Sequence, residues 1–116
     1  LEPAGGYDVH FVLRGTDDPW SLLAGLPGAH DLDSLAVDGA GSVCVGTLTD
    51  AGVTEISADG GDARLHTLPE SLADRAVTNV CFGGDDLRTI YLTCSQHGRL
   101  VKARWHHAGL PVVGQA

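Results

Sequence analysis

Residues 33 to 48 and residues 78 to 94 repeat one pattern. The first segment reads DSLAVDGAGSVCVGTL and the second reads TNVCFGGDDLRTIYLTC, so each has a short apolar run, a turn rich in Gly and Asp, and a second apolar run. Aligning Leu35 with Val80 gives an offset of 45 residues, and aligning the second apolar runs gives 47. Repeats of about 40 to 50 residues that are filled with strands are typical of β-propeller blades. We therefore expect blades of about four strands each.

Alternating apolar residues and the turns between them place the individual strands. Val9, Phe11 and Leu13 alternate with their neighbours as strand residues do, and clusters of Gly and Asp supply the turns. One helical turn is conceivable, in residues 69 to 76. We expect strands near residues 8 to 14, 20 to 26, 34 to 38, 43 to 48, 53 to 57, 63 to 68, 78 to 82, 89 to 95 and 99 to 105.

These strands group into parts of three blades. Residues 8 to 26 are expected to form the end of one blade, residues 34 to 68 one whole antiparallel blade with 34 to 38 innermost, and residues 78 to 105 most of the next blade. Blades bury their faces against neighbouring blades. Residues 1 to 116 are therefore expected to be part of a larger ring, and to self-associate when they exist alone.

The composition describes a turn-rich globular chain of one domain or less, because 43% of its 116 residues are hydrophobic and 16 are Gly. Fifteen acidic and seven basic residues give a formal net charge of -8. This charge disfavours nucleic acid and anionic membrane surfaces as partners. No apolar run approaches the length of a membrane span, which is about 18 to 20 residues.

Three cysteines, Cys44, Cys81 and Cys94, lie within expected strands and lack the C-x-x-C spacing of many zinc and redox sites. An odd number of cysteines in such positions favours buried, reduced thiols over a disulfide framework. We therefore expect a cytoplasmic protein.

The chain also resembles the senescence marker protein, gluconolactonase and luciferin-regenerating enzyme family of six-bladed propellers. The resemblance runs from about Leu26 to Pro111, and its most specific part is VTNVCFGGDDLRTIYLTC. Members of that family are longer, so the resemblance implies that residues 1 to 116 are a C-terminal fragment of a gluconolactonase-like propeller. The implied fold class is all-β, a partial six-bladed β-propeller with about two blades of four-stranded antiparallel sheet.

The resemblance implies metal-dependent hydrolysis of a small-molecule lactone by the full-length protein. One divalent metal ion, which is calcium, zinc, magnesium or manganese, would lie in the central tunnel. The family's segment D-G-L-A-V-D supplies one ligand, and its first Asp matches Asp33, where Ser34 replaces the usual Gly. Asp33 is therefore the candidate metal ligand and the candidate catalytic base, and the other ligands would come from blades outside residues 1 to 116.

Physical reasoning is compatible with this role for Asp33. The inner strands of a propeller line its axis, so a carboxylate where such a strand begins points toward the tunnel mouth. Its oxygen atoms suit a hard cation, which would polarise a lactone carbonyl and activate water. The alternative is that Asp33 caps a turn, as Asp31 or Asp38 would. We expect Asp38, as a plain turn residue, to tolerate Ala at a cost of at most about 1 kcal/mol.

Other polar residues favour structural roles. Thr78 and Asn79 follow Asp33 and Ser34 by one repeat, so both should border the same tunnel, where we expect hydrogen bonding rather than metal ligation. His106 and His107 would point to opposite faces of a strand, so we expect a surface loop end rather than a shared metal site.

The alternative function is an inactive propeller-type binding or scaffold fragment. Hard cations take about six or more oxygen ligands, and Asp33 is one ligand. We therefore expect residues 1 to 116 to show neither tight divalent-metal binding nor robust lactone hydrolysis on their own.

Overall fold

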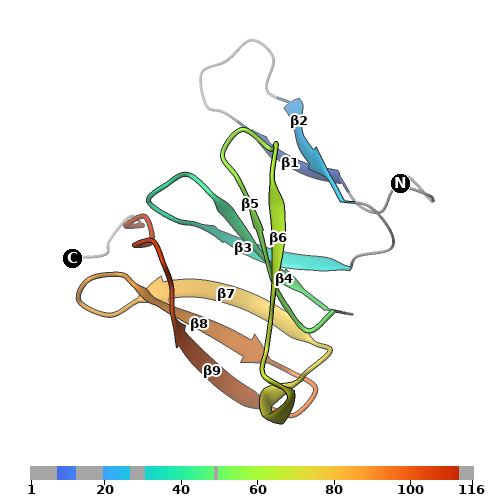
Figure 1. The fold of residues 1–116 in the computed structure, drawn as a ribbon, viewed down its shortest axis with the longest axis vertical. Helices are drawn as coiled ribbons and strands as arrows, with labels where there is room; N and C mark the ends of the chain where they lie inside the picture. The colour runs from blue at the N-terminus through green and yellow to red at the C-terminus, as the bar shows by residue number, and fades with distance from the viewer. Residues whose placement is uncertain (1–7, 13–19, 27–30, 49, 113–116) are drawn as a thin grey trace.

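The computed structural model describes residues 8–12, 20–26, 31–48 and 50–112. These residues form three antiparallel sheets (Figure 1). The sheets contain β1 (Asp8–Val12) and β2 (Trp20–Gly25); β3 (Leu32–Val37), β4 (Val43–Thr47), β5 (Gly52–Ile56) and β6 (Ala63–Thr67); and β7 (Val77–Gly83), β8 (Thr89–Cys94) and β9 (Arg99–Arg104). A short 3₁₀ turn, η1, spans Glu70–Leu72.

The expected strands are confirmed with small changes in their bounds. The sheet expected over residues 34 to 68 is the four-stranded β3-β4-β5-β6 sheet, and the strands expected over 78 to 105 form the β7-β8-β9 sheet. The expected strand at residues 8 to 14 is present to Val12, and its last two residues lie outside the described part of the chain. The one expected helical turn is η1.

The strand register confirms both repeat offsets. Leu35 of β3 pairs with Val45 of β4, and Val80 of β7 pairs with Leu92 of β8. Leu35 and Val80 are therefore 45 residues apart, and their pairing partners Val45 and Leu92 are 47 residues apart. The two extra residues, Gly83 and Thr89, pair with each other and lengthen the β7–β8 hairpin by one residue pair, so the two sheets keep one pairing scheme.

An irregularity in the pairing also recurs in both sheets. In β3 it falls at Asp33 and Ser34, and in β7 it falls at Thr78. Bulges of this kind bend a strand and re-aim its side chains. The repeat therefore includes a local backbone feature at the start of each of these strands.

The main core lies between the two larger sheets, which pack against each other through their apolar residues. β4 and β5 are almost wholly buried, whereas β6 and β9 are mostly exposed. A second cluster packs β2 against β4 and β5. The main core contains Cys44, Val53, Val77, Val80, Phe82, Ile90, Leu92, Cys94, Val101 and Trp105.

The expectation of three buried thiols is wrong for one cysteine. All three are free, and Cys44 and Cys94 are buried in the core, but Cys81 is exposed. Cys81 lies between Val80 and Phe82, whose side chains are buried. Because neighbouring strand residues point to opposite faces, burial of Val80 and Phe82 places Cys81 on the outer face.

After β9 the chain crosses back to the first large sheet. The Gly39 N–H donates to the Ala108 carbonyl at 2.5 Å, and the Leu110 N–H donates to the Val37 carbonyl at 3.1 Å. These bonds fix residues 108–110 against the end of β3, and the two sheets are joined by main-chain contacts as well as by their core.

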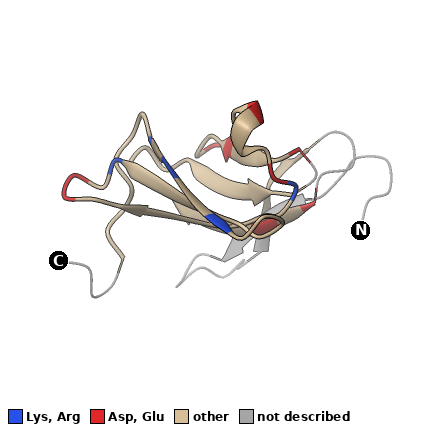
Figure 2. Ribbon diagram, turned by 90° about the horizontal axis from the view of Figure 1, so that it is seen from below, with Lys and Arg blue, Asp and Glu red and all other residues tan. Residues whose placement is uncertain are grey.

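Acidic residues lie mainly at turns and on η1 (Figure 2), where Asp side chains hydrogen-bond their own turns. Among the described residues, no helix is long and apolar enough to cross a membrane.

Candidate functional site

The starts of β3 and β7 form the first candidate site, which we call the inner-strand site and define as Asp33, Ser34, Thr78 and Asn79. The Ser34 hydroxyl lies 3.0 Å from the Thr78 carbonyl oxygen and 2.7 Å from Asn79 Oδ1. A hydroxyl carries one hydrogen, so it donates to one of these acceptors at a time. This contact joins equivalent residues of two repeats, because Ser34 and Asn79 are 45 residues apart.

Gly46 allows the two sheets to come close at this site. A Cβ atom at position 46 would lie 2.8 Å from the Val77 carbonyl oxygen, which is below ordinary van der Waals contact. Residues other than Gly would therefore push the start of β7 away from β4. Glycine at this position keeps Ser34 within hydrogen-bond reach of β7.

Asp33 lies exposed near the start of β3. Within the described residues its side chain makes no hydrogen bond or ion pair, so the alternative role as a turn cap has no support there. Asp38 is the residue that caps a turn: its Oδ1 accepts hydrogen bonds from the Ala40 and Ser42 N–H groups, both at 3.0 Å. The Asp33 carboxylate therefore remains available to bind a ligand.

The hydrogen-bonding roles expected for Thr78 and Asn79 are present. The Thr78 hydroxyl bonds the hydroxyls of Thr93 and Ser95 at 2.9 and 3.0 Å. The Asn79 N–H donates to Thr93 Oγ1 at 2.9 Å, and its side-chain oxygen faces Ser34. These contacts hold the inner-strand site in a defined shape.

The side-chain atoms of the inner-strand site that could bind a metal ion are oxygens, which fit a hard cation such as calcium or magnesium. Asp33 is the one carboxylate in the set, and hard cations take about six or more oxygen ligands. Among the described residues, the group of three His, Cys, Asp or Glu side chains close enough to share a metal ion does not include Asp33.

That group belongs to a second candidate site, the Glu–His cluster, which we define as Glu55, His66, His106 and His107. Glu55 Oε1 lies 2.8 Å from His66 Nε2, and Glu55 Oε2 lies 2.8 Å from His106 Nε2. The ligand atoms of Glu55, His106 and His107 all lie within 4.8 Å of one another. The expected loop end is confirmed, because β9 ends at Arg104 and both histidines lie in the exposed loop that follows. Their side chains do not diverge there as they would on a strand.

The Glu–His cluster is electrostatically coupled. Burial by itself would raise the pKa of Glu55, but hydrogen bonds and the charges of His66 and His106 outweigh it and lower that pKa. Burial raises the pKa of the neighbouring Cys44 thiol far above its usual range, with help from the negative charges of Asp38 and Glu55. Glu55 is therefore an anion, and Cys44 a neutral, unreactive thiol.

One sequence signal could have indicated this cluster. Glu55 and Val53 are two residues apart on β5, so they share a face, and Val53 is a core residue. A carboxylate on a core-facing position needs a partner. The sequence does not show that this partner comes from residues 66 and 106.

The repeated four-stranded and three-stranded antiparallel sheets define a β-propeller protein. The family described as SMP-30/Gluconolactonase/LRE-like region matches residues 11–96. The chain therefore belongs to the SMP-30/gluconolactonase/LRE-like family, a lactonase-like family of propeller type. None of the curated proteins compared with the chain matches it significantly.

Proposed function

We propose that this chain contributes Asp33 to the metal centre of a lactone hydrolase, formed by a complete propeller that includes further blades. The observation that carries the proposal is the exposed Asp33 carboxylate, which makes no hydrogen bond or ion pair with the described residues and directly precedes Ser34, the residue whose hydroxyl contacts Asn79. Family membership supplies the reaction class, and the inner-strand site supplies an anionic oxygen at the position where a ring of blades would converge.

In this proposal each residue has a distinct task. A bound divalent cation, whether calcium, magnesium, manganese or zinc, would polarise the lactone carbonyl and lower the pKa of a water molecule. Asp33 would hold the cation through its carboxylate, and this carboxylate would accept the proton of the attacking water. The Ser34 hydroxyl orients the Asn79 side chain toward the same region.

The alternative function is an inactive binding or scaffold propeller. Its support is the ligand count, since Asp33 is the one carboxylate that the inner-strand site contains. The alternative therefore predicts a complete protein that folds without bound metal and does not hydrolyse lactones.

The test uses the protein translated from the full reading frame that contains this sequence. Asp33→Asn removes the negative charge while keeping the side-chain size, so metal content and the rate of lactone hydrolysis should both fall by at least about 100-fold. Asp85→Asn is the matched control, because Asp85 is an exposed residue in the β7–β8 turn and should leave both unchanged. Full activity and metal content in Asp33→Asn would support the scaffold function instead.

A further inference from the structure

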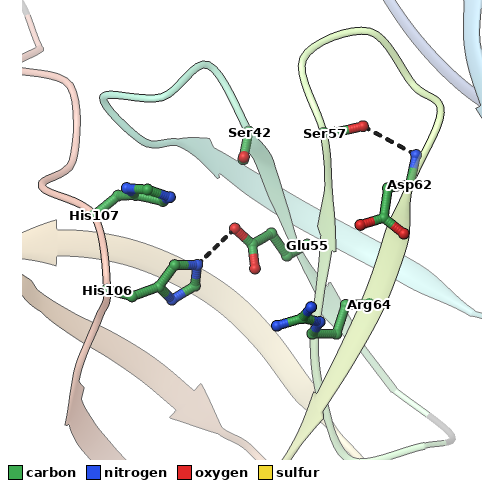
Figure 3. A pocket seen from close by; sticks show the side chains of 7 residues that line it. All are labelled: Ser42, Glu55, Ser57, Asp62, Arg64, His106 and His107. Atoms are coloured by element: carbon green, nitrogen blue, oxygen red, sulfur yellow. Dashed lines mark hydrogen bonds and ion pairs between the residues drawn. The ribbon is translucent and has the colours of Figure 1, made fainter.

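We propose that Glu55, His106 and His107 form a second metal site, for a divalent transition metal of the zinc type. Their ligand atoms lie within 4.8 Å of one another, and the side chains converge on one pocket (Figure 3). Two imidazoles and one carboxylate match the ligand set of many zinc sites. This site is separate from the inner-strand site, which has oxygen donors and no histidine.

The present contacts orient the ligands toward a shared position. Glu55 Oε2 and His106 Nε2 face each other at 2.8 Å, and a metal ion would replace the proton between them. Zinc bonds to nitrogen and oxygen are about 2.0 to 2.2 Å long, which separates two ligand atoms of a tetrahedral site by about 3.4 Å. The pair must therefore open by less than about 1 Å, which side-chain rotation can supply.

His66 holds the carboxylate from its other side. His66 Nε2 lies 2.8 Å from Glu55 Oε1, the oxygen that His106 does not contact. Glu55 and His66 come from neighbouring strands and are partly buried, with side-chain exposures of 12% and 30%. Partners of this kind orient metal ligands and raise affinity. His66 is therefore a positioning residue in this proposal.

The loop that carries the two histidines is fixed at several points. Trp105 is buried, and its main-chain N–H donates to the Arg88 carbonyl at 2.7 Å. The centroid of its ring lies 4.6 Å from that of the His106 ring. Arg88 Nη1 in turn donates to the His106 carbonyl at 3.1 Å. The Ala108 carbonyl accepts a hydrogen bond from the Gly39 N–H. The ligands therefore need little ordering when a metal binds, which favours affinity.

The surrounding pocket suits a cation with open coordination positions. It has a volume of about 290 Å³ and is lined by Ser42, Glu55, Ser57, Asp62, Arg64, His106 and His107. Two carboxylates and one guanidinium leave the wall acidic. Three protein ligands leave at least one position for water or a small ligand.

The family match does not account for this site. The match ends at residue 96 and so leaves out His106 and His107. The expectation that residues 1 to 116 would bind no divalent metal tightly rested on Asp33 as the one ligand. The fold brings together a second set of metal ligands from β5 and from the loop after β9. Calcium, which prefers oxygen ligands, should bind poorly at the Glu–His cluster.

The test is Zn²⁺ and Co²⁺ titration of purified residues 1 to 116 in competition with a chromogenic chelator. A Cys81→Ser background removes the exposed thiol, which could bind the same metals. We expect one bound Zn²⁺ per chain and a Co²⁺ absorption spectrum typical of four-coordinate nitrogen and oxygen ligands. Glu55→Gln and His106→Ala should each weaken binding at least about 100-fold, and His66→Ala about 10-fold to 100-fold.

Controls separate this proposal from misfolding and from the inner-strand site. His97→Ala removes an exposed imidazole from the β8–β9 turn and should bind Zn²⁺ like the parent chain. Asp33→Asn should also bind normally, so failure of the lactonase proposal would leave this result intact. Circular dichroism of each metal-free variant establishes that it is folded. The proposal is overturned if the Cys81→Ser chain binds no Zn²⁺, or if folded Glu55→Gln and His106→Ala bind like His97→Ala.

Discussion

Trp105 donates its indole N–H to Oδ2 of Asp38 at 3.1 Å, although the two residues are 67 positions apart. Asp38 is 0% exposed and Trp105 6% exposed. The other carboxylate oxygen of Asp38 caps the turn after β3. One side chain therefore closes a local turn and joins the two large sheets.

This contact corrects the expected cost of changing Asp38. Asp38→Ala would orphan three buried or half-buried N–H donors, so we expect a loss of more than about 2 kcal/mol rather than the small loss expected of a turn residue. Asp38→Asn keeps the shape but turns an amide donor or a weaker acceptor toward Trp105, and should cost about 1 to 3 kcal/mol. Urea unfolding measures both values. Asp85→Asn, which is exposed, should change the stability by less than about 0.5 kcal/mol, and equal losses in all three variants would contradict the role of Asp38.

A second prediction concerns acid stability at Asp74. Burial acts to raise the pKa of Asp74, but hydrogen bonds from the N–H groups of Ala76, His97 and Gln96 lower it below its usual value. A carboxyl with a lowered folded-state pKa stabilises the fold above its ordinary pKa, and this stabilisation is lost as the pH falls through the folded-state pKa. Asp74→Asn should therefore be less stable than the parent chain at neutral pH.

The measurement is urea unfolding of both chains at about pH 6 and about pH 3. The stability difference should shrink at the lower pH, because the parent chain then loses the contribution of the Asp74 carboxylate. A difference that stays constant across this range would show that Asp74 acts through shape rather than charge.

Self-association is expected at the apolar surface between β3, β7 and the C-terminal segment. A hollow of about 630 Å³ there is lined mainly by apolar residues, and Leu35, Leu110 and Val112 are 47%, 48% and 67% exposed. We propose that this surface pairs with a second copy when residues 1 to 116 exist alone. Sedimentation velocity should show oligomers that Leu35→Lys and Leu110→Lys disperse. Leu100→Lys makes the same charge change on β9 and should not disperse them, and the opposite pattern would indicate pairing through the β9 edge instead.

The isolated chain should be a poor lactonase. Asp33 is the one carboxylate of the inner-strand site, so calorimetry with Ca²⁺ should detect no tight binding by residues 1 to 116. Lactone hydrolysis should stay at the background rate. Robust hydrolysis that a chelator abolishes would show that these residues already contain a complete catalytic site.

The sequence determined the strands and the repeat of the large sheets, because alternation, Gly and Asp turns and a fixed period are local signals. The offset of 45 residues placed Ser34 and Asn79 at equivalent positions of neighbouring blades, and the structure adds the hydrogen bond between them. Thr78 and Asn79 were correctly assigned to hydrogen bonding for the same reason. The role of Asp33 follows from its family and its position on β3, and it stays a prediction.

Only the tertiary structure brought together residues that the repeat does not relate. Glu55 and His106 are 51 positions apart, and Asp38 and Trp105 are 67 apart. Both contacts depend on the path of the chain after β9. There the chain no longer follows the repeat and crosses to the other sheet. A sequence specifies which residues alternate along a strand, but the meeting of a loop with a distant strand is decided by how the sheets pack and where their connecting segments are tied.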